Sequence, residues 1–320
     1  MQPCYLGIDV GSVSTNIVII NAAGEALSSL YIRTMGQPIQ AIKEGLRQIK
    51  ADLPEDVLIN GAGATGSGRY LAGAIIGADI IKNEITAHAV AARQEVPAVQ
   101  TILEIGGQDS KIIILRQGVV TDFAMNTVCA AGTGSFLDQQ AARLGIPIEN
   151  FGELALKSRH PVRIAGRCTV FAESDMIHKQ QMGHNIEDII GGLSEALVRN
   201  YLNNVAKGKE ILAPVVFQGG VAANAGIRAA FSKALQQDII VPRHFAVMGA
   251  LGAALLARNY VNKERVTRFK GFDVAEDNFR VSSFICRGCS NQCEIVNIEE
   301  EGNIIARWGS RCGKWDTLSQ

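Results

Sequence analysis

One pattern constrains the fold of this chain more than any other: a strand, a polar turn containing glycine and a second strand, present twice. In the first copy the apolar runs 5–10 and 16–20 flank the turn 11–15. The second copy, about 97 residues later, spans residues 101–115 with its turn at 106–110. Such a repeat predicts a duplicated three-stranded unit, and helical spacing between strands makes the expected fold class α/β. Helices are expected over about residues 39–50, 186–206 and 223–235, and in an alanine- and glycine-rich run ending near 259.

Length and composition indicate about two packed domains and a small C-terminal module. The chain has 320 residues, of which 47% are apolar and 19% charged, so it can bury a core. Basic and acidic residues number 31 each, so the net charge favours no nucleic-acid partner. Composition changes near residue 261 to a basic, hydrophilic linker, and four of the seven cysteines follow within residues 272–320.

The sequence predicts a cytoplasmic protein without a membrane partner. Its first residues run into an apolar strand without the basic lead of a secretory signal. The longest uncharged stretch, residues 245–257, is too short to span a bilayer and reads as a buried helix. In a reducing compartment, cysteines serve as metal ligands or redox groups more often than as disulfides.

Three glycine turns at strand ends have the composition of a phosphate site. Residues 7–15, GIDVGSVST, place Asp9 at a strand end, where it can hold Mg²⁺ through water, and the turn amides and hydroxyls can cradle phosphate. Residues 104–111, EIGGQDSK, add glycine amides and polar side chains. The third turn, in residues 217–228, FQGGVAANAGIR, suits a flat adenosine ring against backbone.

A water that attacks the γ-phosphate needs an orienting or basic side chain. The second turn offers three candidates for this catalytic role, Glu104, Gln108 and Asp109. We favour Asp109 or Gln108, because Glu104 lies within its strand and could face the Mg²⁺ site instead.

Together these motifs resemble the ATPase superfamily of actin, the heat-shock chaperones and the sugar kinases. More closely, the chain resembles the ATP-dependent activators of 2-hydroxyacyl-CoA dehydratases and the related ATPase subunits of benzoyl-CoA reductase. The matching stretches run in family order through about residues 4–260: LGIDVGSVST, GATGSGR, IGGQDSK, MNTVCAAGTGSFLD, RCTVFAES, QGGVAANAGIR and GALGAALLA. The resemblance implies two RNase H-like domains with ATP in the cleft between them. The first would comprise residues 1–97 plus about 246–262, and the second 98–245.

The resemblance also implies a function, ATP hydrolysis that drives low-potential single-electron transfer to a partner metalloenzyme. That partner would be a 2-hydroxyacyl-CoA dehydratase or a related reductase. The residues expected to contact ATP or ADP are Asp9, Gly11, Ser12, Ser14, Thr15, Gly106, Gly107, Gly132, Thr133, Gly134, Gly219, Gly220 and Asn224.

Two cysteines, Cys129 and Cys168, lie 39 residues apart in the second half of the ATPase. Cys129 directly precedes an expected helix N-terminus, which favours the thiolate. A [4Fe–4S] cluster usually needs four thiolates, so two per chain make half a set. The resemblance implies that a twofold homodimer completes it, with one cluster bridging the subunits. The alternative, two small buried hydrophobic residues, fits the contexts CAAGTG and CTVFAES less well.

The C-terminal module carries a four-cysteine pattern, C-x₂-C-x₃-C-x₁₈-C. A hairpin turning at Glu301-Gly302 would bring two cysteine-bearing turns together. Zinc and a second [4Fe–4S] cluster fit such a site equally by ligand type, and the electron-transfer setting favours the cluster slightly, with ferredoxin or flavodoxin as electron donor. The module departs from the shortest activators and resembles the segment after the ATPase domain in larger fused ones. Its cysteines are Cys286, Cys289, Cys293 and Cys312.

Two other functions remain open for this fold. A small-molecule kinase would need a catalytic carboxylate beside a bound substrate and would have no use for Cys129 and Cys168. A chaperone-like or filament-forming nucleotide switch would need a peptide-binding domain or polymerisation surfaces, and the sequence gives no clear sign of either. A brown, oxygen-labile protein would favour the electron activator.

Overall fold

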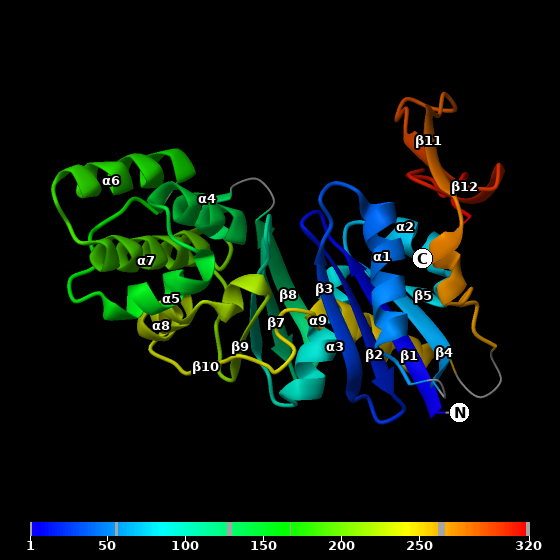
Figure 1. The fold of residues 1–320 in the computed structure, drawn as a ribbon, viewed down its shortest axis with the longest axis horizontal. Coiled ribbons are helices and arrows are strands. Elements are labelled where there is room, and N and C mark those ends of the chain that lie inside the picture. Colours follow the sequence, from blue (N-terminus) through cyan, green and yellow to red (C-terminus); the bar gives the residue numbers. More distant parts are fainter. Residues whose placement is uncertain (1, 55–56, 127–129, 167, 262–265, 318–320) are drawn as a thin grey trace. The chain divides into compact units, whose positions relative to one another are not determined.

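The computed structural model forms two compact units by internal contacts (Figure 1). The first comprises Met1–Ala91 and Gly249–Gln320, and the second comprises Ala92–Met248. All residues are described except 1, 55–56, 127–129, 167, 262–265 and 318–320.

The first unit is built on a sheet in the order β3-β2-β1-β4-β5. β1, β2 and β3 pair antiparallel, whereas β4 runs parallel to β1 and β5 parallel to β4. The strands are β1 (Gln2–Val10), β2 (Ser14–Asn21), β3 (Ala26–Arg33), β4 (Val57–Thr65) and β5 (Ile80–Ile81). The helices are α1 (Pro38–Ala51), α2 (Arg69–Ile76), α3 (Glu84–Glu95), which ends in the second unit, and α9 (Met248–Tyr260).

The alanine- and glycine-rich helix α9 packs directly on β1 and β4. A Cβ on Gly7 of β1 would lie 1.9 Å from the carbonyl oxygen of Ala250, and one on Gly63 of β4 would lie 2.2 Å from that of Ala253. Only glycine allows a helix and a strand to approach this closely. The apolar run at 245–257 therefore contributes to a buried helix, as predicted.

The second unit repeats this strand order as β8-β7-β6-β9-β10. Again three strands pair antiparallel and the remaining pairs, β6 with β9 and β9 with β10, are parallel. The strands are β6 (Thr101–Ile105), β7 (Ser110–Arg116), β8 (Val119–Asn126), β9 (Val215–Gln218) and β10 (Ile239–Ile240). The matching order in two sheets confirms the duplicated unit predicted from the repeated strand–turn–strand pattern.

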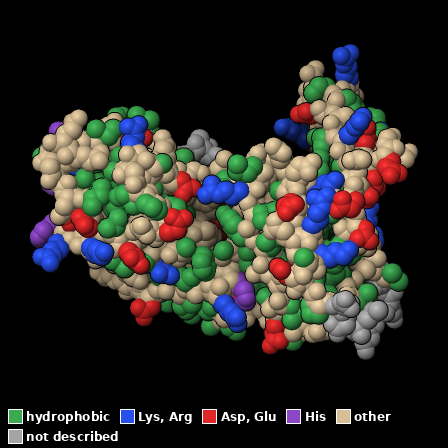
Figure 2. All heavy atoms as spheres, viewed as in Figure 1, with side chains coloured by type: hydrophobic (Ala, Val, Ile, Leu, Met, Phe, Trp, Pro, Cys, Tyr) green, Lys and Arg blue, Asp and Glu red, His purple; other side chains and the backbone are tan. Residues whose placement is uncertain are grey.

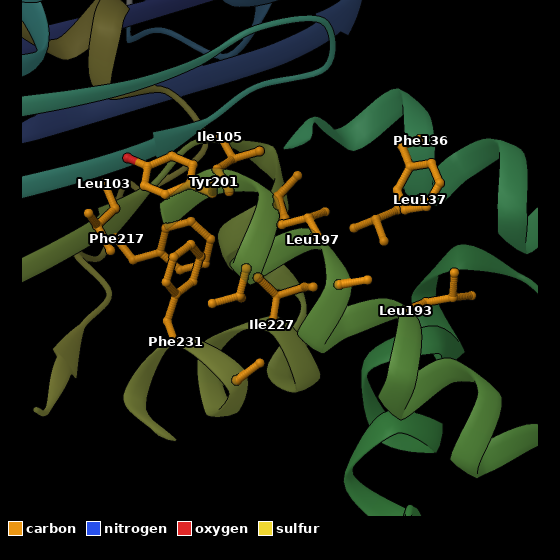
Figure 3. Close-up of a cluster of buried hydrophobic side chains, with 14 of the residues drawn as sticks. Leu103, Ile105, Phe136, Leu137, Leu193, Leu197, Tyr201, Phe217, Ile227 and Phe231 are labelled. Atoms are coloured by element: carbon orange, nitrogen blue, oxygen red, sulfur yellow. The ribbon is translucent and has the colours of Figure 1, made fainter. Parts of the chain in front are cut away.

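Helices α4, α5, α6, α7 and α8 complete the second unit, and its core lies between one sheet face and this helical layer (Figure 1). Tyr201 packs edge-on against Phe231, which also contacts Phe217 (Figure 3). The helices are α4 (Gly134–Leu144), α5 (Ile148–Lys157), α6 (Thr169–Gln181), α7 (Ile186–Asn204) and α8 (Ala225–Leu235), with the short helices η1 (Ala130–Gly132) and η2 (Gly220–Ala223).

A third, antiparallel sheet of β11 (Phe279–Ile285), β12 (Glu294–Glu300) and β13 (Asn303–Trp308) follows the short helix η3 (Phe272–Glu276). The predicted hairpin turn is present, with φ of +50° at Glu301 and +82° at Gly302. The sheet docks on α2, where the rings of Tyr70 and Trp308 stack 6.1 Å apart. Helix η3 docks on α1 through Arg47, whose Nε donates to Oε1 of Glu276 at 2.7 Å.

The described part of the stretch predicted as a basic, hydrophilic linker is attached to the first unit by hydrogen bonds and an ion pair. Asp79 receives the backbone N–H of Arg268 at 2.8 Å and the hydroxyl of Thr267 at 2.6 Å. Lys270 pairs with Glu300 at 2.8 Å. These partners lie far away in the sequence, so composition alone did not reveal them. Lys263 and Arg265, also assigned to the linker, lie outside the described residues.

Charged side chains of both signs are interspersed on the face shown in Figure 2, in keeping with 31 basic and 31 acidic residues. No broad basic patch gathers on that face. Within the part of the chain that the structure describes, none of the helices has the length and apolar character needed to cross a membrane.

Candidate functional site

The carboxylate of Asp9, at the end of β1, lies between two glycines. A Cβ on Gly249, in the first turn of α9, would lie 2.0 Å from Oδ2 of Asp9. A Cβ on Gly66, in the turn after β4, would lie 2.5 Å from Oδ1. The first backbone N–H groups of a helix favour a negative charge, so the start of α9 suits this carboxylate. Sequence reasoning found Asp9 but missed both glycines that shape its position.

The turn after β1 is compact and closed by a backbone hydrogen bond. The N–H of Gly11 donates to the carbonyl of Ser14 at 2.9 Å, and Ser12 is exposed. Thr15 is fully buried, with its hydroxyl 3.0 Å from that of Thr34. Gly11, Ser12 and Ser14 therefore remain candidates for phosphate contact, whereas the hydroxyl of Thr15 is engaged inside the unit.

The turn between β6 and β7 is organised around Lys111, a buried lysine that sequence reasoning missed. Its Nζ lies 3.0 Å from Oε2 of Glu104 and 2.9 Å from Oδ2 of Asp109. The β6–β7 register places Glu104 directly opposite Lys111, which was the available signal. Gln108 is exposed, whereas Glu104 is buried. The three predicted catalytic residues thus share one turn but occupy different environments.

Tyr201 of α7 contacts this turn through a hydrogen bond from its hydroxyl group. Its hydroxyl donates to the carbonyl oxygen of Lys111 at 2.6 Å. Burial raises the pKa of Tyr201 well above its ordinary value, so the phenol stays protonated and keeps donating. Figure 3 shows its ring within the aromatic group of the core.

The start of α4 is joined to the same glycine turn. The N–H groups of Gly134 and Ser135 donate to the carbonyls of Gly106 and Gly107, both at 2.8 Å. The hydroxyl of Thr133 donates to the carbonyl of Ala130 at 2.7 Å. Of the expected nucleotide contacts in CAAGTG, Thr133 and Gly134 thus help to build the turn itself.

The third turn lies beside the second. Gly219 has φ of +88°, and a Cβ there would lie 2.4 Å from the carbonyl oxygen of Ile105 and 2.9 Å from Oε1 of Glu104. Gly220 borders open space. Asn224 caps α8, because its Oδ1 accepts the N–H of Ile227 at 3.0 Å. The second unit therefore brings two of the three predicted glycine turns together.

Of the two cysteines expected to bind the cluster, Cys129 lies outside the described residues. Cys168 is the N-cap residue of α6, with extended backbone and no side-chain capping bond. It is half-buried, and the next turn exposes Val170 and Phe171 at 67% and 65%. Its thiol is thus partly accessible and makes no capping bond, so this residue fits a metal ligand.

In the C-terminal module the N–H of Cys286 donates to the carbonyl of Cys293 at 2.8 Å. The backbone N–H of Gly288 and then the indole of Trp315, 3.3 Å from Sγ, lower the pKa of the Cys286 thiol. Among the described residues, which include all four cysteines of this module, no three His, Cys, Asp or Glu side chains gather in a metal-binding group. The fold thus brings parts of the motif together without assembling four ligands, and the predicted metal site remains a prediction.

Several known proteins are similar to this chain. The chain is 38% identical over 258 residues to the (R)-2-hydroxyglutaryl-CoA dehydratase activating ATPase of Acidaminococcus fermentans, covering 79% of this chain and 96% of that protein. It is 35% identical over 263 residues to the activator of lactoyl-CoA dehydratase of Anaerotignum propionicum, covering 81% and 99%. The solved activator of the 2-hydroxyisocaproyl-CoA dehydratase from Clostridium difficile, with bound ADPNP, matches with a TM-score of 0.75 and 32% identity over 82% of this chain and 96% of that one.

These structural and sequence matches confirm the expected actin-like ATPase fold. The profile of the BadF/BadG/BcrA/BcrD ATPase family matches residues 6–257 and ends before the C-terminal sheet. The chain therefore belongs to the BadF/BadG/BcrA/BcrD ATPase family, and a C-terminal sheet whose connecting segments carry cysteines follows the matched residues.

Proposed function

We propose that this protein is an ATP-hydrolysing electron activator for a metalloenzyme of the 2-hydroxyacyl-CoA dehydratase or related reductase type. One observation carries the proposal. The start of α4 is hydrogen-bonded to the glycine turn at Gly106-Gly107, and the same run of chain leads back within five residues to Cys129. A change at the nucleotide turn would therefore reach the cysteine loop through a few backbone bonds. The names of the relatives, which are dehydratase activators, support the same activity.

For the nucleotide, the turns of each unit supply the needed groups. Asp9 would hold Mg²⁺ through water, and the amides of the three glycine turns would take the phosphates and the adenosine. Lys111 would hold Asp109 in place, while the exposed Gln108 is free to reach a water. A relative solved with bound ADPNP supports ATP as the nucleotide.

For the electron, Cys129 and Cys168 of each subunit would hold one [4Fe–4S] cluster across a homodimer. When bound, the cluster would supply a one-electron carrier. Cys168 fits this role because its thiol is partly exposed and makes no capping bond. The exposed Val170 and Phe171 beside it offer apolar area to a second copy of the chain. Ferredoxin or flavodoxin is proposed as the donor.

The test is metal analysis of protein purified without oxygen. A bridging [4Fe–4S] cluster predicts about four irons per dimer, lost in Cys129→Ala and in Cys168→Ala. Cys4→Ala is the matched control, because Cys4 is a fully buried thiol in β1. ADP binding should persist in all three variants, since none alters a nucleotide turn.

An iron content in Cys129→Ala equal to that of wild type, or wild-type protein that takes up no iron under reconstituting conditions, would refute the proposal. The same analysis tests the C-terminal module. Additional iron or zinc that disappears in Cys286→Ala would support its predicted metal site, and no additional metal would refute it.

A further inference from the structure

Described residues close in sequence to each of the two cysteines of the second unit lie against one side chain of α7. The carbonyl of Gly166, two residues before Cys168, accepts a hydrogen bond from Nδ2 of Asn200 at 2.8 Å. Gly132, three residues after Cys129, is so close that a Cβ there would lie 3.0 Å from Oδ1 of Asn200. One amide group therefore meets both loops, each with a different polar atom.

This amide is buried, since Asn200 is only 1% exposed. Burying an amide costs free energy unless its polar atoms are hydrogen-bonded. A buried asparagine is therefore held in one orientation and fixes the position of the group it bonds. The adjacent Arg199 makes a second hydrogen bond to the segment before Cys168, because its Nη2 donates to the carbonyl of Ile164 at 2.7 Å. From α6, Oδ2 of Asp175 accepts the N–H of Ala165 at 2.8 Å.

The second loop is equally constrained. Helix η1 ends at Gly132, and a Cβ on this glycine would also lie 3.8 Å from Nδ2 of Asn126 and 3.8 Å from Oγ of Ser110. Ser110 starts β7, directly after the nucleotide turn. Gly132 thus lies between the sheet and Asn200, and a side chain at this position would crowd the Oδ1 atom of Asn200.

We propose that Asn200 is a positioning residue that sets the spacing between the Cys129 loop and the Cys168 loop. The inference rests on the proposed function, in which these two cysteines bind the cluster. Hydrogen-bonding partners behind the ligands of a metal commonly change metal affinity by about 10- to 100-fold when they are removed. Asn200 would act in this way without touching the cluster.

The first test measures iron release from the reconstituted dimer to a ferrous chelator. Asn200→Asp keeps the shape but removes the donor to Gly166, and Asn200→Leu removes both polar atoms. Both variants should release iron about tenfold faster than wild type. Asn203→Ala, an exposed asparagine of the same helix, should release iron at the wild-type rate. ADP affinity should stay within about twofold of wild type in every variant, because Asn200 is outside the predicted nucleotide contacts. Wild-type release rates in both Asn200 variants would overturn the inference while leaving the proposed function intact.

The second test needs no cluster. In metal-free protein, Gly132→Ala should lower the Tm because the new Cβ meets Oδ1 of Asn200. In an Asn200→Ala background, Gly132→Ala should lower the Tm by less than half as much as it does in wild type. In an Asn203→Ala background, the decrease in Tm should be the same as in wild type. An equal decrease in Tm in all three backgrounds would refute the contact between position 132 and Asn200. If wild-type protein takes up no iron, the proposed function fails, and this cycle still reports whether Asn200 spaces the two loops.

Discussion

Replacing Gly249 by alanine should displace the carboxylate of Asp9 and lower ATPase activity without lowering the stability of the fold. A Cβ at 249 would lie 2.0 Å from Oδ2 of Asp9, and an ordinary contact begins near 3.4 Å. The oxygen must therefore move by about 1.4 Å. A misplacement of about 1 Å can cost about 100-fold in rate. We expect Mg²⁺-dependent ATP hydrolysis to fall about 100-fold in Gly249→Ala, because the carboxylate proposed to hold Mg²⁺ is displaced.

Stability should change little in the same variant, because the displaced atoms belong to a side chain and alanine favours a helix. Gly252→Ala, one turn later in α9, is the matched control. Its Cβ would lie 1.9 Å from the carbonyl oxygen of Ala87, so backbone must shift. Overpacking of this kind costs about 1–3 kcal/mol, or about 2–12 °C in Tm for a protein of this size.

The assay pairs phosphate release at saturating MgATP with thermal melting of each variant. The reasoning predicts an active-site defect with a near-normal Tm for Gly249→Ala, and a lowered Tm with near-normal hydrolysis at low temperature for Gly252→Ala. The reasoning is refuted if Gly249→Ala retains more than half of the wild-type ATPase rate.

Three further substitutions test other contacts. Lys111→Met leaves two carboxylates without their ammonium partner, so it should cost about 3–5 kcal/mol and lower the Tm of the second unit by about 6–20 °C in calorimetry. Trp315→Phe removes a donor that lowers the pKa of Cys286, so the pKa should rise and less thiolate should be present at a given pH. The pH profile of Cys286 alkylation by iodoacetamide, followed by mass spectrometry, should therefore move to higher pH. Trp308→Ala removes the ring stacked on α2, so limited proteolysis should release the C-terminal sheet sooner.

Each of these three substitutions has a control that makes a weaker contact of the same kind or none. Lys233→Met breaks an exposed pair with Glu195 and should change the Tm by little more than about 1 °C, because surface ion pairs are weak. Lys314→Ala should move the Cys286 profile less than Trp315→Phe, since its charge is a smaller cause of the lowered pKa. Ile304→Ala alters an exposed residue of β13 and should leave proteolysis unchanged. Equal effects of variant and control would contradict each argument.

Local chemistry explains what the sequence predicted well. The turns around Gly11 and Gly106 and the hairpin at Glu301-Gly302 depend on residues close together in the chain, where glycine marks the required backbone. The helix predicted over residues 39–50 appears as Pro38–Ala51, because its apolar positions recur at helical spacing. Duplication of such local units was enough to predict two sheets.

Contacts between distant residues explain what the sequence did not reveal. Gly249 and Asp9 are neighbours only after α9 has packed on β1, and nothing in either local pattern indicates it. The attachment of Arg268 to Asp79 joins residues 189 positions apart, so a segment with a linker's composition becomes part of the first unit. Asn200 reads as one more polar residue on an amphipathic helix until its two neighbouring loops are seen.

The docking of the C-terminal sheet has a mechanical consequence. Arg47 and Lys50 of α1 fasten η3, and Tyr70 of α2 fastens β13, so the sheet is attached to the first unit at two separate points. Two attachments remove the swivel that a single tether would leave. The sheet therefore belongs to the same body as α1 and α2, within the first unit. The loops that carry Cys286, Cys289, Cys293 and Cys312 are anchored through the sheet to the strands and helices of that unit.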